Sequence, residues 1–233
     1  RGIAQIDGKT TFIAGALLHE DVMFTYSKRK SSYDEGQVVE VIGASQERVE
    51  PHCDHYGVCG GCSLQHMHHA SQVELKSRTF SELLQREIGV APNEWAEPMV
   101  ASSLGYRRKA RLSVKYVEKK QKVLVGFRER NGRYVADITH CSVLHASVGS
   151  EIQALSDLLY SLSIRASIPQ IEVSVGDDAT AIIVRHLVDM PDHDQQAWID
   201  FAMARQWLLF FQPEGMDSIH LVSPQDRAPY LHY

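Results

Sequence analysis

The stretch P-H-C-D-H-Y-G-V-C-G-G-C-S-L-Q-H, residues 51–66, holds three of the four cysteines of this 233-residue chain. Its C-x5-C-x2-C spacing places Cys53, Cys59 and Cys62 in one short loop, while Cys141 lies far downstream. Three thiolates of one loop can occupy three corners of a tetrahedral metal or cluster site, and a distant fourth thiolate completes it. The pair Gly60-Gly61 lets the backbone fold tightly and point N–H groups at the sulfurs. The sequence therefore predicts one site made by all four cysteines.

Other roles are open to these cysteines. Disulfides need an oxidising compartment, yet no secretory segment is visible, and a chain of this length does not need covalent staples. Four unrelated buried thiols are a second alternative. Structural zinc favours the same four-thiolate tetrahedron, but zinc knuckles usually carry two C-x2-C pairs, and the second pair is missing here. We interpret Cys53, Cys59, Cys62 and Cys141 as ligands of a 4Fe–4S cluster, with zinc as the alternative.

The composition is that of a globular protein of one or two domains, with 44% apolar and 23% charged residues. No apolar run approaches the length needed to span a membrane, and the N-terminus lacks the pattern of a signal peptide. We expect a cytoplasmic monomer without a membrane partner, in a compartment where thiols stay reduced and can bind metal.

The charge is unevenly distributed along the chain. The net charge is −5, but residues 101–140 carry eleven Lys or Arg against three acids, and residues 141–233 carry four against twelve. A basic segment within an acidic chain favours a localised anion-binding face, although strands with solvated outward lysines give the same pattern. Side chains of a strand alternate between its two faces, so Arg108 is expected to point away from its basic neighbours. The candidates for phosphate contact are Arg107, Lys109, Arg111, Arg128, Arg130, Lys28, Arg29 and Lys30.

Three regions follow from the periodicity. Strand-like runs at 10–16, 21–26 and 37–43 with glycines at their corners predict an incomplete, small β-barrel of the OB type over residues 1–46. Residues 47–70 form the cysteine loop. The nearby His55, His66, His68 and His69 are expected to be surface groups or to surround the metal ligands rather than to bind metal.

Residues 71–233 predict a mixed α+β domain. Apolar residues at helical spacing indicate a helix over 71–88, with Ser71 as N-cap and Gly89 at its end. G-D-D-A at 176–179 indicates a hairpin tip, which is a more ordinary setting for Asp177-Asp178 than a catalytic site. The other expected elements are strands over 111–117, 123–130, 134–138, 171–175, 179–186, 207–211 and 218–222, a turn at Asn131-Gly132, and helices over 150–163 and 191–205. No nucleotide-binding, hydrolase or metalloprotease signature is present.

The cysteine stretch resembles the iron–sulfur motif of bacterial 23S rRNA (uracil-5-)-methyltransferases that also bear an N-terminal TRAM domain. L-G-Y-R-R-K-A-R-L-S-V (104–114) is similar to that family's Y-R-x-K/R strand. V-G-F-R-E-R-N-G-R-Y-V-A-D-I-T-H-C (125–141) resembles its G-F-x…C segment, which ends in the fourth cluster ligand. The β-rich opening followed by S-Q-E-R-V-E-P (45–51) is similar to the end of a TRAM barrel, so the resemblance covers roughly residues 1–145.

The resemblance implies an enzyme that methylates carbon 5 of a uracil in 23S rRNA with S-adenosylmethionine, through a cysteine adduct at carbon 6. The target base has to leave its stack, which favours a loop or single-stranded region. The family's catalytic domain, with its S-adenosylmethionine loop, nucleophilic cysteine and carboxylate base, has no recognisable counterpart in residues 1–233. The expectation is therefore a part of the enzyme that grips RNA, carries the cluster and is inactive alone, with no catalytic residue assigned. A stand-alone RNA-binding module with structural zinc or iron–sulfur, or an iron–sulfur redox protein, is the alternative.

Overall fold

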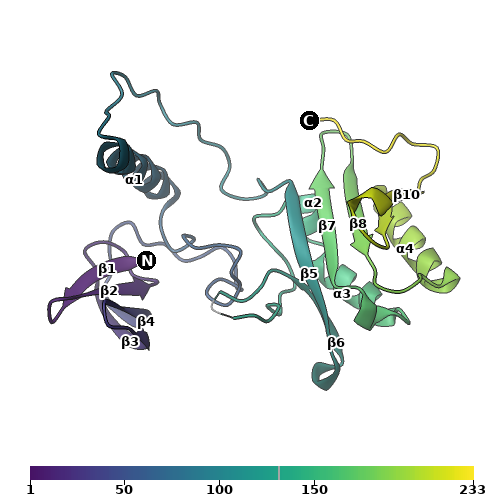
Figure 1. Ribbon diagram of the computed structural model, residues 1–233, viewed down its shortest axis with the longest axis horizontal. Coiled ribbons are helices and arrows are strands. Elements are labelled where there is room, and N and C mark those ends of the chain that lie inside the picture. Colours follow the sequence, from purple (N-terminus) through teal and green to yellow (C-terminus); the bar gives the residue numbers. More distant parts are fainter. Residues whose placement is uncertain (131) are drawn as a thin grey trace. The chain divides into compact units, whose positions relative to one another are not determined.

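The computed structural model describes residues 1–130 and 132–233. These residues form two compact units, and Figure 1 labels most of their helices and strands. The first unit contains residues 1–52 and 64–100, and the second contains residues 53–63 and 101–233. Each unit has its own mixed β-sheet and at least one helix, which confirms the expected α+β class.

The first unit contains a four-stranded sheet in the order β1-β2-β4-β3. Strands β2 and β4 run parallel, and the other two pairs are antiparallel. The sequence indicated three of these strands and missed β1, which pairs with β2 across a tight turn at Asp7-Gly8. Both turn residues have positive φ, 52° and 77°, as a type I′ hairpin turn requires. The strands are β1 (Gly2–Ile6), β2 (Lys9–Ala14), β3 (Asp21–Arg29) and β4 (Tyr33–Gly43).

Helix α1 (His69–Ile88) belongs to the same unit. It starts two residues before the predicted N-cap Ser71, so that assignment was wrong. Its N-cap position is His68, which makes no side-chain capping bond. The amide of Gln72 instead donates to the carbonyls of Leu64 and Met67, which ties the first turn to the preceding chain. The predicted end at Gly89 is confirmed, because this glycine adopts the left-handed conformation that terminates helices.

A buried ion pair joins residues 45–48 to the strands of the first unit. The Glu20 carboxylate, whose side chain is fully covered, accepts bonds from Arg48 Nε at 2.5 Å and Arg48 Nη2 at 2.6 Å. The backbone N–H groups of Leu17 and Ser45 donate to the same carboxylate, and Arg48 Nη2 also reaches the carbonyl of Gly15. These bonds fix the point at which the chain leaves the sheet.

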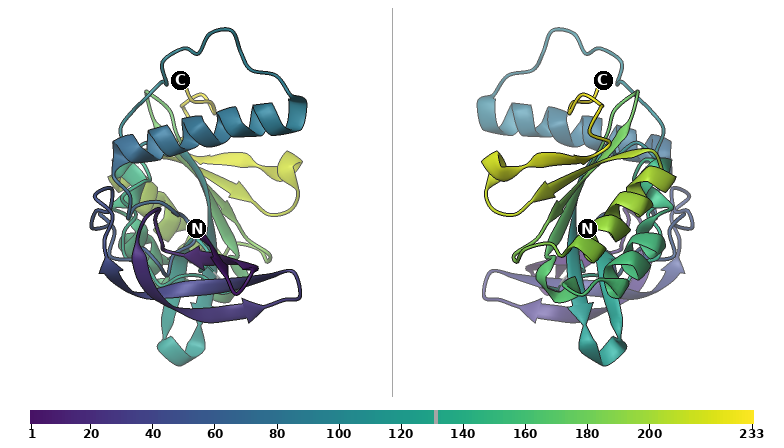
Figure 2. Two further views of the ribbon diagram at one scale, coloured as in Figure 1. Left: turned by 90° about the vertical axis from the view of Figure 1, so that its left-hand side faces the viewer. Right: turned by 90° about the vertical axis from the view of Figure 1, so that its right-hand side faces the viewer.

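The second unit contains a six-stranded sheet in the order β10-β9-β8-β7-β5-β6, in which β8 and β9 are the parallel pair. Figure 2 shows two helices, α3 and α4, lying across one face of this sheet. Short 3-10 turns follow β5 and precede β7 and β10. The elements are β5 (Lys109–Val117), β6 (Lys122–Gly126), α2 (Ala146–Gly149), α3 (Ile152–Ser161), β7 (Gln170–Val175), β8 (Thr180–Arg185), α4 (Asp192–Ala204), β9 (Trp207–Gln212) and β10 (His220–Ser223).

One hydrophobic core fills the space between the helices and the sheet. Leu112 of β5 and Ile171 of β7 meet Leu155 of α3 and Trp198 of α4 there, all fully buried. Burial of such side chains contributes about 1.5–3 kcal/mol each to the free energy of folding. The opposite side of β5 is exposed at Lys109 and Arg111 because residues of a strand alternate between its faces.

Most predicted elements of the second unit are confirmed within two residues, with two exceptions. The expected strand over 123–130 ends at Gly126, whose φ is 148°, and no strand forms over 134–138. There the described chain makes an isolated bridge between Arg128 and Val135. The reason is that the backbone of 128–130 bonds to the cysteine loop instead of extending the sheet. The predicted turn at Asn131-Gly132 includes residue 131, which lies outside the described residues.

The boundaries of the two compact units differ from the predicted ranges 1–46, 47–70 and 71–233. The division into those three functional domains stays a prediction. Residues 53–63 group with the second unit because their backbone bonds to residues 128–130. None of the helices in the described part of the chain is long and apolar enough to cross a bilayer.

Candidate functional site

The cysteine loop is fastened to residues 128–130 by backbone hydrogen bonds. Gly60 N–H donates to the carbonyl of Arg128 at 2.8 Å, and Arg130 N–H donates to the carbonyl of Val58 at 2.9 Å. Between these bonds, Cys59 forms a bridge with Glu129. The loop therefore runs alongside the segment that follows β6, as a short two-stranded pairing.

The geometry explains why two glycines occur in this loop. A Cβ at Gly60 would lie 2.8 Å from the carbonyl oxygen of Arg128, closer than real Cβ atoms approach. A Cβ at Gly61 would lie 3.1 Å from the ring of Phe127. Gly61 N–H also donates to Cys59 Sγ at 3.4 Å, as the sequence predicted for this pair. The close approach of the two backbones at Gly60 therefore depends on the absence of a side chain there.

The segment around Cys141 lies against the same loop. His55 Nε2 accepts a bond from Thr139 N–H at 3.1 Å, and its ring lies 4.9 Å from the ring of His140. Cys141 N–H donates to the carbonyl of Gly149 at 2.9 Å. Of the four histidines near the cysteines, His55 thus connects the cysteine loop to the residues before Cys141, while His66 is buried in the first unit.

All four cysteines are free thiols and half-buried, which argues against the disulfide alternative. Burial raises the pKa of Cys59, and the charges of the other three cysteines raise it further. The hydrogen bond from Gly61 N–H acts in the opposite direction and lowers the pKa. Burial likewise raises the pKa of Cys141, with N–H bonds from the two residues Val143 and Leu144 acting in the opposite direction. The structure thus brings the four side chains within electrostatic reach of one another.

The side chains do not adopt the arrangement of a closed metal site. Across residues 1–130 and 132–233, no group of three or more His, Cys, Asp or Glu side chains is placed to hold a metal ion. The donor set itself, four free thiols with N–H groups directed at two of them, fits a soft metal or an iron–sulfur cluster.

A basic cleft opens beside the cysteine loop. It has a volume of about 520 Å³ and lies within the second unit. Gly60 and Gly61 form part of its wall, and Phe127 and Glu129 contribute to the lining. Sequence reasoning missed these last two as lining residues, although both stand in the basic stretch G-F-R-E-R that it did single out. The cleft collects five of the eight predicted phosphate-binding residues: Arg107, Lys109, Arg111, Arg128 and Arg130.

Several cations of the cleft are held by neighbours. The guanidinium of Arg107 lies 5.3 Å from the centre of the Phe127 ring. Arg130 donates from Nη2 to the carbonyl of Ser63 at 3.2 Å. Arg111 Nε lies 3.0 Å from Glu172 Oε1, with the Arg111 side chain 68% exposed. These contacts orient the cations and leave Arg111 open to a ligand.

The remaining predicted cations lie elsewhere. Arg108 Nη1 is 2.6 Å from Asp177 Oδ1 at the tip of the β7–β8 hairpin, which agrees with the expectation that it points away from its neighbours. Lys28, Arg29 and Lys30 lie at the end of β3 in the first unit. There Arg29 stacks on the ring of Tyr26, with 4.1 Å between guanidinium and ring centre.

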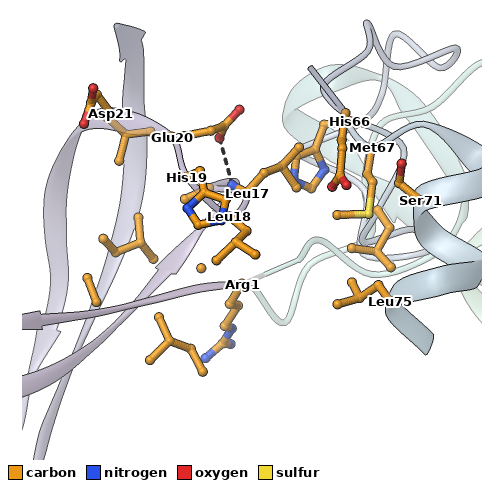
Figure 3. Close-up of a pocket in the computed structure, with 18 of the residues that line it drawn as sticks. Arg1, Leu17, Leu18, His19, Glu20, Asp21, His66, Met67, Ser71 and Leu75 are labelled. Carbon is orange, nitrogen blue, oxygen red and sulfur yellow. Dashed lines mark hydrogen bonds between the residues drawn. The ribbon is translucent and has the colours of Figure 1, made fainter. Parts of the chain in front are cut away.

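A second cavity, of about 650 Å³, lies in the first unit between the sheet and α1 (Figure 3). Leu17 and Leu18 line one side, and Met67 and Leu75 line another. Its lining includes none of the predicted site residues. The bond from Leu17 N–H to Glu20, drawn in Figure 3, belongs to the buried ion pair described above.

Comparison with known proteins finds relatives over the full length of the chain. No protein-family model matches. A protein of Alcanivorax borkumensis named 23S rRNA (uracil(1939)-C(5))-methyltransferase RlmD is 44% identical over 233 residues, which is 100% of this chain and 52% of the relative. A protein of the same name from Nitrosococcus oceani is 46% identical over 225 residues, 96% of this chain and 50% of the relative. The chain spans about half the length of the curated relatives it matches.

The fold is also similar to a solved structure. The crystal structure of Pyrococcus abyssi tRNA (uracil-54, C5)-methyltransferase, in complex with S-adenosyl-L-homocysteine, matches with a TM-score of 0.60. The match covers 100% of this chain and 54% of that one, at 16% sequence identity. At this identity the similarity concerns the fold.

Proposed function

Because the chain belongs to the family of 23S rRNA (uracil-C5)-methyltransferases, we propose that it supplies RNA-binding parts of such an enzyme. The whole enzyme would transfer a methyl group from S-adenosylmethionine to carbon 5 of a uracil in 23S rRNA. The observation that carries the proposal is the cleft in which five basic side chains meet beside the cysteine loop.

The cleft has the chemistry that a phosphate backbone requires. Four of its five cations are arginines, whose planar guanidinium groups match phosphate oxygens in a bidentate manner. Arg111 and Arg128 are exposed, so a ligand can reach them without rearrangement of the core. An unpaired RNA segment is the occupant we propose, because a flexible backbone can follow a short cleft and its bases remain accessible.

We further propose that Cys53, Cys59, Cys62 and Cys141 hold a 4Fe–4S cluster, with zinc as the alternative. The spacing of the thiols, the fact that none of them is joined in a disulfide, and the N–H groups directed at Cys59 and Cys141 support this. A group held this way would close a loop of chain from Cys62 to Cys141 and so stabilise the fold around the cleft. The sheet of the first unit would be a TRAM-type module, with Lys28, Arg29 and Lys30 adding phosphate contacts.

RNA binding at different salt concentrations tests the proposal. The 233-residue chain is titrated into a fluorescent stem-loop of 23S rRNA with an unpaired loop, and anisotropy is read over a salt series. Each phosphate contact to a single strand contributes about 0.7 to the slope of log affinity against log salt. Changing Arg107, Lys109 and Arg111 together to Ala should weaken binding and flatten the slope by up to about 2.

The matched control is Arg108→Ala, which removes a neighbouring cation that lies outside the cleft and pairs with Asp177. It should leave affinity and slope close to those of the unchanged chain. An unchanged slope in the triple variant would show that the cleft cations are merely solvated and would refute the proposed interface.

A further inference from the structure

The cysteine loop and the basic cleft share one piece of backbone. Gly60 and Gly61 belong to the loop and also line the cleft. We propose that this shared turn makes RNA binding depend on whether the four-cysteine site is occupied. Metal bound by the thiols orders the cleft, and loss of the metal lowers the affinity for RNA. The inference rests on the proposed function and adds a means of regulating it.

Backbone hydrogen bonds at the Gly60-Gly61 turn connect the four-cysteine site to the cleft. Cys59 supplies a thiol, and its backbone forms a bridge with Glu129 in the opposite segment. On either side of it, Gly60 N–H donates to the Arg128 carbonyl and Arg130 N–H donates to the Val58 carbonyl. The two residues bonded to the loop are therefore the ones that carry two of the cleft's guanidinium groups.

The side chain of Arg130 adds a second connection. It donates to the carbonyl of Ser63, directly after Cys62, and lies 5.5 Å from the centre of the Tyr56 ring. Both partners belong to the cysteine loop. A shift of the loop would therefore move the Arg130 guanidinium itself as well as its backbone.

The part of the cysteine loop that belongs to the second unit, residues 53–63, has no regular secondary structure that would hold it in place. Residues 53–63 contain turns and isolated bridges but no helix or strand. Such a segment opens locally at low free-energy cost unless an additional restraint closes it. A metal bound by three loop thiols and Cys141 is such a restraint, because it joins the loop to the far end of the basic segment.

The first experiment compares the unchanged chain with and without metal. One sample is reconstituted under nitrogen with ferrous iron and sulfide, a second with zinc alone, and a third is stripped with a chelator. Hydrogen exchange should show greater protection of the Gly60 and Arg130 amides in the loaded samples. The amide of His186, which donates to the Gln212 carbonyl at the β8–β9 side of the sheet, serves as a remote reference and should not change.

RNA affinity is measured on the same three samples. If the cations of Arg128 and Arg130 lose their positions, the salt slope should fall by about 1.4, two contacts at about 0.7 each. Relative to binding at 1 M salt, a slope smaller by about 1.4 lowers the affinity of the stripped chain at 0.1 M salt by roughly 25-fold.

The variant Gly60→Ala separates the two sites while keeping every thiol and every cleft cation. Its methyl group meets the Arg128 carbonyl and pushes the segments apart. Metal should still bind, as seen from metal content, whereas RNA affinity should be weak in both loaded and stripped forms. Gly215→Ala is the matched control, because a Cβ there meets nothing within 4 Å.

The possible results distinguish failure of the coupling from failure of the proposed function. Equal RNA affinity and equal protection in loaded and stripped unchanged chain would overturn the coupling while leaving the proposed interface intact. Loss of protection at His186 as well would also overturn it, since metal would then support the whole unit rather than the shared turn. Absence of RNA binding in every sample, including the loaded one, would instead refute the proposed function.

Discussion

Replacing Glu20 with Gln should destabilise the first unit at neutral pH and have a much smaller effect at acid pH. In the unchanged chain, burial raises the pKa of Glu20, but the bonds from Arg48, Leu17 and Ser45 and the charge of Arg48 outweigh it. The pKa is thereby lowered from 4.5 to about 2. At about 1.36 kcal/mol per pKa unit, this corresponds to roughly 3 kcal/mol of stability at neutral pH.

The sign follows from the direction of the pKa change. A carboxylate with a lowered folded-state pKa binds protons more weakly in the folded state than in the unfolded state. Its contribution is fully present above the unfolded value of 4.5 and disappears as the pH falls toward about 2. In Glu20→Gln the carboxylate is gone, so the variant should lack this part of the pH dependence.

Urea unfolding at pH 7 and at pH 2.5–3 measures the effect, with hydrogen exchange of the Leu17 and Ser45 amides to assign it to the first unit. Glu87→Gln is the matched control, because Glu87 pairs with Arg86 on the exposed surface of α1, where its side chain is 58% accessible. Exposed pairs contribute about 0–1 kcal/mol. A difference between Glu20→Gln and the unchanged chain that is the same at both pH values would refute the reasoning.

Three further predictions concern the second unit. Cys62→Ser should lower the bound metal per chain and reduce hydrogen-exchange protection over 127–130 as well as in the loop; a loss confined to the loop would contradict the proposed closure. Arg108→Ala should change thermal stability by at most about 1 kcal/mol, because its ion pair is exposed. Burial raises the pKa of Asp194, but hydrogen bonds from Ser163 and Ile164 outweigh burial and lower the pKa overall. The stability that this carboxylate contributes should therefore be lost as the pH drops below 3.8. Asp194→Asn should therefore cost about 1–3 kcal/mol in urea unfolding at pH 7 and flatten that pH dependence, and equal stability would refute it.

Strands β5 and β7 of the second unit could be predicted from the sequence because their residues alternate between core and solvent. Leu112 and Val114 are buried while Lys109 and Arg111 are exposed, which is the period-two pattern of a strand covered on one face. The first unit was less readable. In β1, Ile3 is 69% exposed, so apolar residues do not mark its buried side. The Asp7-Gly8 turn was the signal that would have revealed this strand.

The sequence singled out the five cations that line the cleft but not the shape of the cleft, and their role in binding stays a prediction. Period two correctly grouped the cations of β5, and a local count of charges identified the basic segment. The pairing of Gly60 with Arg128 could not be derived, because it joins segments far apart in sequence and depends on β6 ending early. The reason for a glycine at position 126 is visible only in the folded structure, where a Cβ would lie 2.6 Å from the side chain of Ile138. A glycine inside an apolar run otherwise fits a strand with a bulge equally well.

The negative net charge of the chain does not conflict with an anion-binding cleft, because screening makes electrostatics local. At physiological salt the Debye length is about 8 Å, so acids farther away than that contribute little to the potential in the cleft. Two carboxylates stand at the cleft itself: Glu129 in its lining, and Glu172, which is engaged by Arg111. Another acid, Asp177, is paired with Arg108 outside it. Five cations against two carboxylates leave a positive cleft on a chain whose net charge is −5. An RNA strand approaching within a Debye length therefore meets the local excess of positive charge, and the distribution of charge predicts the ligand where the total does not.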